Sequence, residues 1–443
     1  MIETIQLKRT CLLAVLILGV CFAAQTVHAA TFVVGTCKSG THYTTIQAAV
    51  NAASTAGPSV VDVCPGTYNE QVTITKNRLT LAGIQAGTAD FAALYPPIGG
   101  LATNGADIFG NQVATQIFVK NASGVIIKNL TVDGTGNKVA PCVPYTMEGI
   151  YFQNSSGTIT NNVVRNQYQT DFAHNGPCQN GLAINVESLT STSNVTVAHN
   201  SVRAYQKNGI TATGAANGVA SDGPYVQIIN NYIVGLGATA MNWKTPGAAE
   251  NGIQVGFGAS GQILENTIND NIWALDTIDD TGDAASGIII FASPSFTVIH
   301  NNVNSAQYGI LIESDTGDGY GTADHTFISD NDISGTQIFD AIDLCSSGNT
   351  AQGNNIFGSA ESAIHLDDEC GGTGNNNTVF QNTITEGCAG VLLGTGTGNV
   401  VRTNNVYNDV NFTTLAGDAC NPPAEATSKN GHRPRPSPYM PMR

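Results

Sequence analysis

One short pattern recurs along most of this chain and limits the folds that it can adopt. Segments that begin with Gly-Ile or a close variant start at positions 149, 181, 209, 252, 287, 309, 341, 363 and 390, at spacings of 22 to 43 residues. Each is followed by a turn, a short strand pattern and an Asn that precedes an Ile or Val by two residues. Repeats of this length are typical of solenoids, in which each unit buries its apolar residues only by stacking on its neighbours.

The Asn of each repeat predicts a buried ladder. Asn tolerates a left-handed backbone at a sharp corner, and its amide can hydrogen-bond the same Asn one coil away. We expect the ladder to comprise Asn161, Asn200, Asn231, Asn266, Asn301, Asn331, Asn354, Asn382 and Asn404.

The N-terminal part predicts a helix followed by the first coil. In residues 44–54, "TTIQAAVNAAS", apolar side chains fall at helical spacing, and Thr44 with Gln47 forms a candidate capping box. The next segment, "VVDVCPGTYNEQVTI", indicates a strand, a Pro65-Gly66 turn and another strand.

Together these features resemble the right-handed parallel β-helix proteins of the pectin-lyase-like superfamily, over roughly residues 31–412. The resemblance implies an all-β solenoid with an N-terminal amphipathic helical cap. It does not imply one activity, because the superfamily includes pectate lyases, polygalacturonases, alginate epimerases, tailspikes and adhesins. The pectate-lyase Trp-Ile-Asp-His, the polygalacturonase Asn-Thr-Asp, Gly-His-Gly and Arg-Ile-Lys, and the epimerase Asp-Pro-His-Asp are all absent from the sequence.

The two ends of the chain differ from the repeats. Residues 1–29 carry Lys8 and Arg9 before the apolar run "CLLAVLILGVCFAA", which predicts a signal peptide and an extracellular or periplasmic location. Residues 30–420 are expected to form the β-helix domain, with no membrane span. Residues 421–443 are rich in Pro and basic residues and predict a disordered tail.

Cysteine usage agrees with export. An even number of cysteines remains after the predicted cleavage, which favours disulfides. Proximity in the sequence suggests four pairs, which proximity alone does not fix: Cys37–Cys64, Cys142–Cys178, Cys345–Cys370 and Cys388–Cys420.

The charge of the chain restricts its partners. The formal net charge is −16, and both predicted terminal segments are net basic, so the body is more acidic still. This disfavours nucleic acid as a partner. No cofactor is expected. The segments "DDTGD" at 279–283 and "DTGDG" at 315–319 could hold Ca²⁺, although turn formation is the more ordinary reason for such sequences.

Strand alternation selects a candidate catalytic group on the outer side of the Gly-Ile strands. Asp343 and His365 are expected on adjacent coils, about 4.8 Å apart, with Asp367 about 6.6 Å further along and Glu313 on the same side. The resulting distance of roughly 8 Å between Asp343 and Asp367 suits an inverting acid–base pair of carboxylates. In the resembled families this face forms the floor of the substrate groove. A solvated acidic face and a metal site are the alternatives.

Further residues are candidates for substrate binding. Trp243 and Trp273, with Lys244 nearby, are expected in loops that flank the groove, and Tyr151 points outward on an earlier coil. Aromatic rings suit stacking on sugars, and anchoring their own loops is the alternative role. Arg165 and Arg203 form a basic column that could neutralise a uronate in a lyase, unless Arg165 only pairs with Asp133.

These observations predict a secreted, monomeric protein that binds and hydrolyses an extracellular polysaccharide. A non-catalytic, adhesin-like β-helix is the main alternative, and a polysaccharide lyase is the third.

Overall fold

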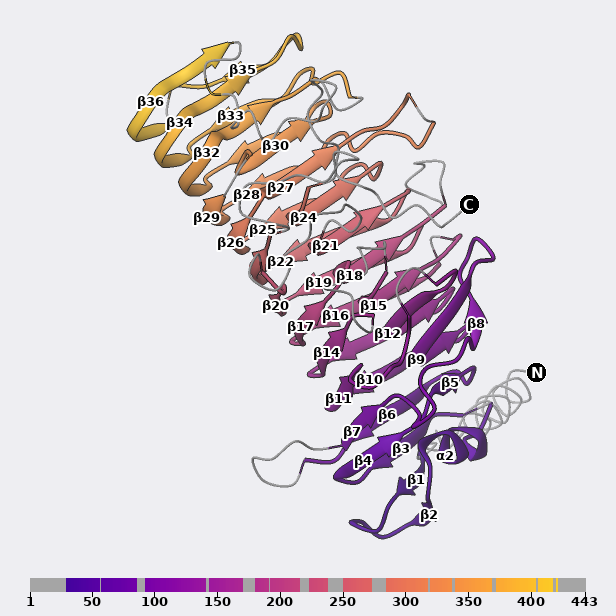
Figure 1. The fold of residues 1–443 in the computed structure, drawn as a ribbon. Coiled ribbons are helices and arrows are strands. Elements are labelled where there is room, and N and C mark those ends of the chain that lie inside the picture. Colours follow the sequence, from indigo (N-terminus) through magenta and orange to yellow (C-terminus); the bar gives the residue numbers. More distant parts are fainter. Residues whose placement is uncertain are drawn as a thin grey trace, which may run out of the picture.

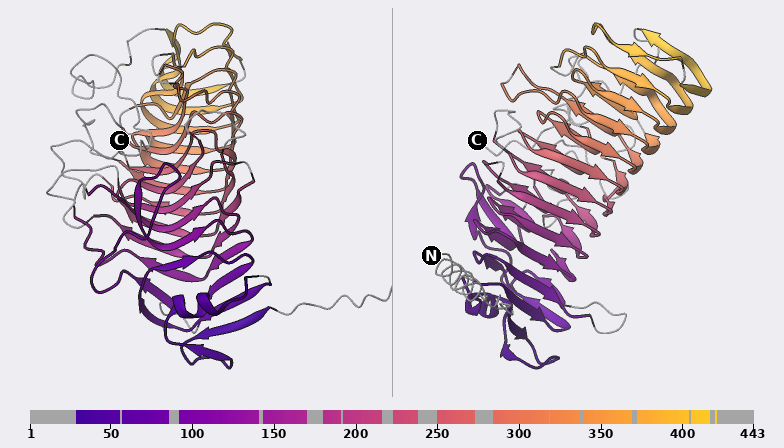
Figure 2. Two further views of the ribbon diagram at one scale, coloured as in Figure 1. Left: turned by 90° about the vertical axis from the view of Figure 1, so that its right-hand side faces the viewer. Right: turned by 180° about the vertical axis from the view of Figure 1, so that it is seen from behind.

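The computed structural model describes residues 29–55, 57–85, 92–140, 143–169, 180–190, 192–215, 223–237, 250–272, 284–317, 319–336, 339–368, 372–403, 405–416 and 420. They form an elongated stack of coils that runs from the N-terminal to the C-terminal end (Figure 1). Successive strands of each face lie parallel, one coil above the next, as Figure 2 shows from two further sides. The predicted parallel β-helix is therefore confirmed.

Each coil contributes strands to three faces. The first is a parallel sheet in the order β2 (Thr41–Tyr43), β1 (Ala30–Val34), β3 (Ser59–Val63), β6 (Leu79–Gly83), β10 (Val125–Lys128), β13 (Gly157–Thr160), β16 (Asn194–Ala198), β19 (Tyr225–Ile229), β22 (Ser260–Leu264), β25 (Thr297–Ile299), β28 (Phe327–Ser329), β31 (Thr350–Gln352), β33 (Thr378–Phe380) and β35 (Val400–Val401).

The second face, which we call the Gly-Ile face, contains the strands predicted from the repeat. It comprises β5 (Val72–Ile74), β9 (Gln112–Lys120), β12 (Thr146–Gln153), β15 (Leu182–Glu187), β18 (Asn208–Thr213), β21 (Asn251–Gly256), β24 (Ser286–Phe291), β27 (Tyr308–Glu313) and β30 (Ile342–Cys345). The short strand β8 (Gly105–Ala106) pairs with β9 in the antiparallel sense.

The third face contains the strands that follow the Asn steps. It comprises β4 (Gly66–Asn69), β7 (Ala92–Tyr95), β11 (Leu130–Asp133), β14 (Val163–Gln167), β17 (Ser201–Tyr205), β20 (Tyr232–Val234), β23 (Thr267–Asn271), β26 (Asn302–Ala306) and β29 (Asp332–Thr336). In the last coils, the long strands β32 (Asn355–Leu366), β34 (Thr383–Leu393) and β36 (Val406–Ala416) run through both this face and the Gly-Ile face.

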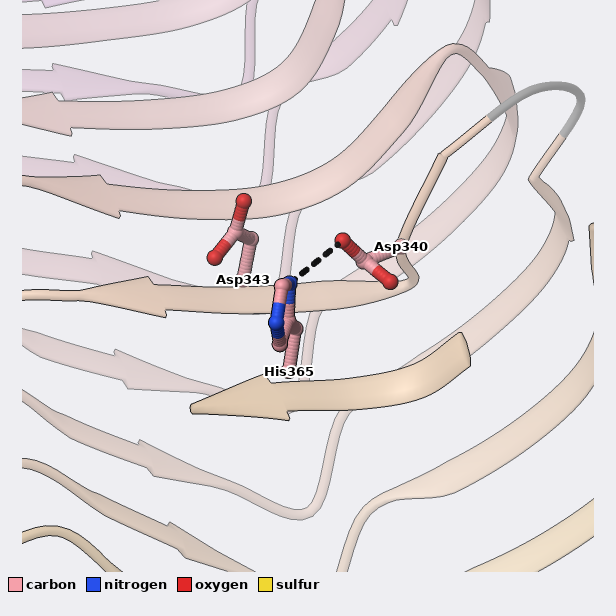
Figure 3. A group of neighbouring side chains, drawn as sticks. All are labelled: Asp340, Asp343 and His365. Atoms are coloured by element: carbon pink, nitrogen blue, oxygen red, sulfur yellow. Dashed lines mark hydrogen bonds and ion pairs between the residues drawn. The ribbon is translucent and has the colours of Figure 1, made fainter. Parts of the chain in front are cut away.

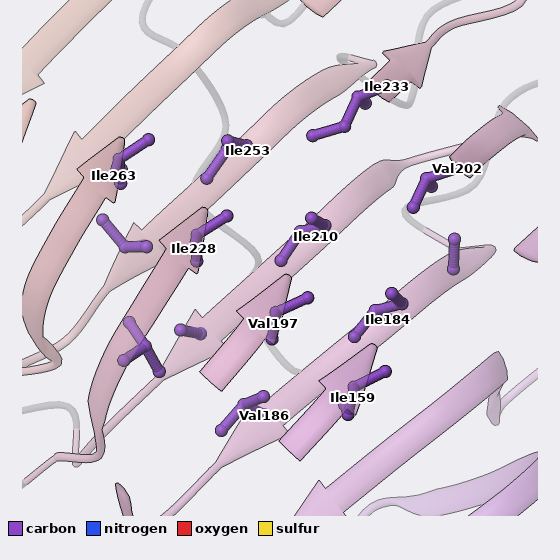
Figure 4. Close-up of a cluster of buried hydrophobic side chains, with 14 of the residues drawn as sticks. Ile159, Ile184, Val186, Val197, Val202, Ile210, Ile228, Ile233, Ile253 and Ile263 are labelled. Atoms are coloured by element: carbon purple, nitrogen blue, oxygen red, sulfur yellow. The ribbon is translucent and has the colours of Figure 1, made fainter. Parts of the chain in front are cut away.

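The core follows from strand alternation. Every second residue of a Gly-Ile strand points into the solenoid, where one column runs Ile150, Ile184, Ile210, Ile253, Ile288, Ile310, Ile342 and Ile364 in register. These residues are fully buried and pack against the other two faces (Figure 4). Stacking identical branched side chains removes a continuous apolar surface from water.

The predicted helix is present as α2 (Ile46–Ala52), which buries Ile46, Ala49 and Val50 against the first strands. Its N-cap is Thr45 rather than the predicted Thr44, because the Thr45 hydroxyl accepts from the Ala48 amide. The carboxylate of Glu70, on the segment after β4, accepts from two further amides of the first turn. Closure of the solenoid end by this helix stays a prediction.

A continuous ladder of buried Asn side chains joins the coils, as predicted. The ladder runs in the order Asn162, Asn200, Asn231, Asn266, Asn301, Asn331, Asn354, Asn382 and Asn405. From Asn200 onward, each amide oxygen accepts from both the backbone and the side-chain nitrogen of the Asn one coil before it. Asn161 is exposed, so the prediction was one residue off there, and Asn404 lies outside the described residues.

The sharp corner itself is made by the residue before the ladder Asn. That residue has a left-handed backbone, with φ between 54° and 60°, at Asn161, His199, Asn230, Glu265, His300, Asp330 and Gln381. His199 and His300 therefore form corners of the fold, and the left-handed residue is the one before the ladder Asn rather than the Asn itself, which the sequence suggested.

Replacing Asn266 with Ala is expected to destabilise the protein by about 1–3 kcal/mol for each buried polar group that loses its partner. The Asn266 amide accepts from Asn231 and donates to the Ile228 and Leu264 carbonyls and to Asn301. Urea denaturation would measure the effect. Asn302→Ala is the matched control, since Asn302 is an exposed neighbour in the next coil and should tolerate the change. Equal stability of both variants would contradict a buried ladder.

Disulfides are found at both ends of the solenoid. Cys37 bonds Cys64 and Cys388 bonds Cys420, as predicted. Cys345 is disulfide-bonded, and its predicted partner Cys370 lies outside the described residues, as do Cys142 and Cys178. Among the described residues, no helix has the length and apolar character needed to cross a membrane.

Candidate functional site

The outer side of the Gly-Ile face carries three kinds of side chain in succession. From β9 to β21 it carries polar side chains, among them Glu187 and Asn185, together with the stacked rings of Phe118 and Tyr151. An apolar patch of Ile289, Phe291 and Leu311 follows on β24 and β27, packed with Phe257 and Phe339. Ionisable side chains then return on β30 and β32.

The first candidate group is the Asp–His cluster, formed by Asp340, Asp343, His365 and Asp367. Asp343 and His365 are direct neighbours in the register of β30 and β32, as predicted. Their side chains point to the same side of the sheet, opposite the core residues Ile342 and Ile364 (Figure 3). Alternation and coil alignment therefore predicted this pair correctly.

Asp340 completes the cluster, and the sequence did not indicate it. Its Oδ2 lies 3.3 Å from His365 Nδ1, and Asp367 Oδ2 lies 3.7 Å from the same nitrogen. The Asp340 Oδ1 accepts from the amide and the hydroxyl of Ser362. Asp340 stands in the corner before β30, where strand alternation says nothing about the direction of a side chain.

The cluster does not line an open groove, which corrects the prediction. Asp343, Asp367 and Glu313 are each 1% exposed and His365 is 4% exposed. Glu313 lies in register with Phe291 and Cys345, beside the apolar patch. The outer side of the Gly-Ile face is thus a second packed layer at this position rather than a solvated floor.

A second candidate group lies nearer the N-terminus and was missed. It is the Glu pair, Glu148 on β12 and Glu187 on β15. Both carboxylates accept from one side-chain nitrogen, Asn185 Nδ2, at 2.7 Å and 3.1 Å. The Thr115 hydroxyl donates to Glu148 at 2.6 Å, and the Tyr151 phenol donates to Glu187.

Burial shifts the acidity of the Glu pair. Loss of water raises the pKa of Glu187 to about 7, with repulsion from Asp107 acting in the same direction against its hydrogen bonds. Burial, and then repulsion from Glu187, hold the pKa of Glu148 well above its usual range. Both effects have a common cause, because two like charges in a dry site disfavour the ionised forms. Burial thus favours the protonated form of Glu148, and Glu187 titrates at about 7.

A hairpin covers the Glu pair. β8 pairs with the start of β9, and the turn between them is held by Asp107, whose carboxylate accepts from Phe109 and Asn111. The Ile108 amide donates to Glu187 Oε2 at 3.3 Å. The Gln153 side chain donates to the Ala106 carbonyl at 2.6 Å. This hairpin thus connects directly to the carboxylate and to the strand beneath it.

Tyr151 does not have the predicted exposed position. Its ring is fully buried and stacks on Phe118 with 5.0 Å between ring centroids, so it offers no free face to a sugar. Its hydroxyl instead holds Glu187. Trp243, Lys244 and Trp273 lie outside the described residues.

The basic column lies on another face. Arg165 and Arg203 are neighbours in the register of β14 and β17, as predicted, and these strands belong to the third face. Arg165 is paired with Asp133 at 2.7 Å, and Arg203 stands over the ring of Tyr232. The residues of the lyase alternative are therefore not assembled with either carboxylate group.

A separate pocket lies in the last coils, where it is lined by Leu393, Gly394, Val401, Tyr407, Thr414 and neighbouring residues. None of its lining residues belongs to the Glu pair or to the Asp–His cluster.

Comparisons with known proteins give similarity in fold only. No family model and no curated protein matches the sequence. Similar solved structures include the A-module of a mannuronan C-5 epimerase from Azotobacter vinelandii, which is 15% identical, with 84% of this chain and 93% of that chain covered and a TM-score of 0.46. A surface adhesin of Streptococcus pneumoniae is 16% identical, with 85% and 89% covered and a TM-score of 0.49.

A DFA-IIIase from Arthrobacter chlorophenolicus A6, without its lid, is 13% identical, with 90% and 94% covered and a TM-score of 0.46. Values this low identify neither a family nor an activity for this chain.

Proposed function

We propose that this chain is an exported, carbohydrate-active β-helix protein that hydrolyses glycosidic bonds with Glu148 and Glu187. The observation that carries the proposal is the shared contact of both carboxylates with Asn185 Nδ2. Because Glu148 Oε1 and Glu187 Oε1 both lie within hydrogen-bond distance of this one nitrogen, the two carboxyl groups are close together. Retaining glycosidases likewise hold their two carboxyl groups only about 5–5.5 Å apart. This pair replaces Asp343 and Asp367 as our candidate acid and base.

The environments of the two carboxyls suggest their roles. Burial and repulsion from Glu187 hold the pKa of Glu148 well above its usual range, which favours its protonated form, so Glu148 is our candidate for the acid that donates a proton to the leaving oxygen. Glu187 titrates at about 7, and the Tyr151 phenol stabilises its ionised form. Glu187 is thus the nucleophile or base, since an acid–base pair needs environments that separate the two acidities.

Substrate reaches the Glu pair only when β8 and the turn after it, which we call the β8 arm, move aside, because both carboxyls are now 1% exposed and β9 is held between β5 and β12. The β8 arm contacts the Glu pair side through the Ile108 amide, which donates to Glu187, and through the Ala106 carbonyl, which accepts from Gln153. Closure over a bound sugar would exclude water from the acid–base pair.

The polar side chains beyond the pair suit a ligand that is rich in hydroxyl groups. Asn208, Thr211, Asn251 and Gln254 form a hydrogen-bonded network on β18 and β21, further along the same side of the sheet. Amide and hydroxyl groups both donate and accept, as sugar hydroxyls do. The resemblance to pectin-lyase-like proteins, whose substrates bind along this sheet, also supports a polysaccharide.

One observation favours a non-catalytic binding protein instead. Both carboxylate groups and the apolar patch between them are buried, so the Gly-Ile face presents no open site among the described residues. In that function the buried acids would only fix the packing of the outer layer.

Incubation of the purified protein with a panel of polysaccharides separates these functions. We expect new reducing ends without the ultraviolet absorbance of unsaturated products, and retention of the anomeric configuration in the first product. Unsaturated products would instead assign a lyase. Binding without cleavage, or no interaction with any glycan of the panel, would support the display function and count against catalysis.

A further inference from the structure

We infer that the Asp–His cluster is a binding site for one divalent transition-metal ion, for which Zn²⁺ is the probe. This inference concerns the opposite part of the Gly-Ile face from the Glu pair and does not depend on the proposed hydrolysis.

The geometry of the three nearest ligands carries the inference. One ligand atom each of Asp340, Asp343 and His365 lies within 4.8 Å of the other two, and all three residues are buried. Zn²⁺ binds nitrogen and carboxylate oxygen at about 2.0–2.2 Å, so donors around one ion lie no more than about 4.4 Å apart. Figure 3 shows the three side chains gathered between β30 and β32, so metal binding requires their ligand atoms to approach by only a few tenths of an ångström.

The surroundings hold these ligands in place. The Asp340 Oδ1 is bound by Ser362, which leaves Oδ2 directed at the imidazole. Asp343 and His365 stand on strands in the interior of the sheet, so their backbones are fixed by the register of β30 and β32. Asp367 Oδ2, 3.7 Å from His365 Nδ1, is placed as a fourth ligand or as an outer partner of the imidazole.

The chemistry of the ligand set selects the class of ion. Ca²⁺ and Mg²⁺ prefer sites made only of oxygen, whereas an imidazole with carboxylates suits Zn²⁺ and its neighbours in the first transition row. A divalent ion would also bring two positive charges to a group of buried carboxylates, whose ionised forms are costly without compensation.

The ion would act as a clamp between coils. Asp340 and Asp343 belong to the coil of β30, and His365 belongs to the coil of β32. The ion stabilises the folded chain because the ligands are not preassembled in the unfolded chain, and the stabilisation grows with the logarithm of the ratio of ion concentration to Kd.

The test uses the full chain after treatment with a chelator. We expect calorimetric titration with ZnCl₂ to show one tight equivalent, and thermal unfolding to shift upward with Zn²⁺ but not with equal CaCl₂ or MgCl₂. Bound Co²⁺ should give visible absorption bands. Asp343→Asn and His365→Gln should each lower the affinity for Zn²⁺ at least about 10- to 100-fold. Asp409→Asn, an exposed carboxylate in the last coil, should leave it unchanged.

Three results would overturn the inference. The native chain could bind no Zn²⁺ while its circular dichroism spectrum is that of a folded protein. It could bind Ca²⁺ more tightly than Zn²⁺. Both variants could fold and still bind Zn²⁺ as the native chain does, which would place the ion elsewhere. The first two results come from the native protein and do not depend on whether the variants fold.

Discussion

Glu187→Gln is expected to slow cleavage of the glycan identified in the panel by about 10²- to 10⁴-fold, the range that a positioned acid–base group contributes. Gln fills nearly the same volume, and its one amide oxygen can accept either from Tyr151 or from Asn185, but it cannot carry the negative charge of the nucleophile or base. The loss should appear in kcat and in kcat/KM alike, because the charge acts in the transition state. Steady-state rates at pH 8 measure it.

The pH profile distinguishes this role from a structural one. In the native protein, kcat/KM should rise as pH increases through about 7, because Glu187 must lose its proton to act. The Glu187→Gln variant should retain only a small residual rate without that rise. Glu386→Gln, an exposed acid on β34, is the control and should behave like the native protein.

A native rate in Glu187→Gln would exclude the Glu pair. Asp343→Asn and Asp367→Asn, assayed in parallel, would then show whether the acid–base chemistry belongs to the Asp–His cluster instead. A rate lost only in those variants, together with an inverted product, would restore the pair that the sequence suggested, since inverting enzymes keep their carboxyls about 6.5–9.5 Å apart.

The sequence predicts the coils of this protein well because they follow from two repeated signals, the two-residue alternation of the strands and the Asn at each corner. Alternation of branched residues sets the inward column that contains Ile342 and Ile364, and the recurring Asn sets the ladder. Both signals are local and repeated, so an error in one coil does not spread to the next. The adjacency of Asp343 and His365 follows from the same two signals.

The Glu pair escaped because strand alternation does not fix the register between coils, and because Glu148, two residues before the inward Ile150, would point into the core by alternation. Aligning the Gly residues places Gly149 beside Gly181, whereas the structure pairs Ile150 with Ile184. A shift of two residues keeps every side chain on its own face and changes only its neighbours. Tyr151 therefore lies beside Asn185, and Glu187 reaches Glu148 through that amide.

The strand pattern could not predict that the outward side chains of the Gly-Ile face are buried. A period of two residues tells which side chains leave the core, but not what packs over them. The hairpin that carries Asp107 and Ile108 lies outside the repeat, and so does the corner that carries Asp340. Acidic residues on an outward column thus predicted a solvated groove, where the structure has two dry clusters.

The second large effect expected of the Glu pair is on stability. The pKa of Glu187 rises from 4.5, the ordinary value of a glutamate carboxyl, to about 7 in the folded protein, so between these values the folded chain holds a proton that the unfolded chain has released. Stability falls with pH wherever the folded state binds more protons. The contribution is present below pH 4.5, is lost as pH rises through about 7, and is on the order of 3 kcal/mol.

Urea denaturation of the native protein and of Glu187→Gln at pH 5 and pH 8 tests this expectation. Gln cannot ionise, so the variant should lose most of the difference between the two pH values, and the two proteins should differ more at pH 8 than at pH 5. Comparing proteins at each pH removes the titration of all other groups. The control Glu386→Gln should keep the native slope, because that side chain is exposed. If the stability of the native protein and of Glu187→Gln depended on pH in the same way, Glu187 would be ionised in the folded protein. The raised pKa that we assign to Glu187 would then be wrong.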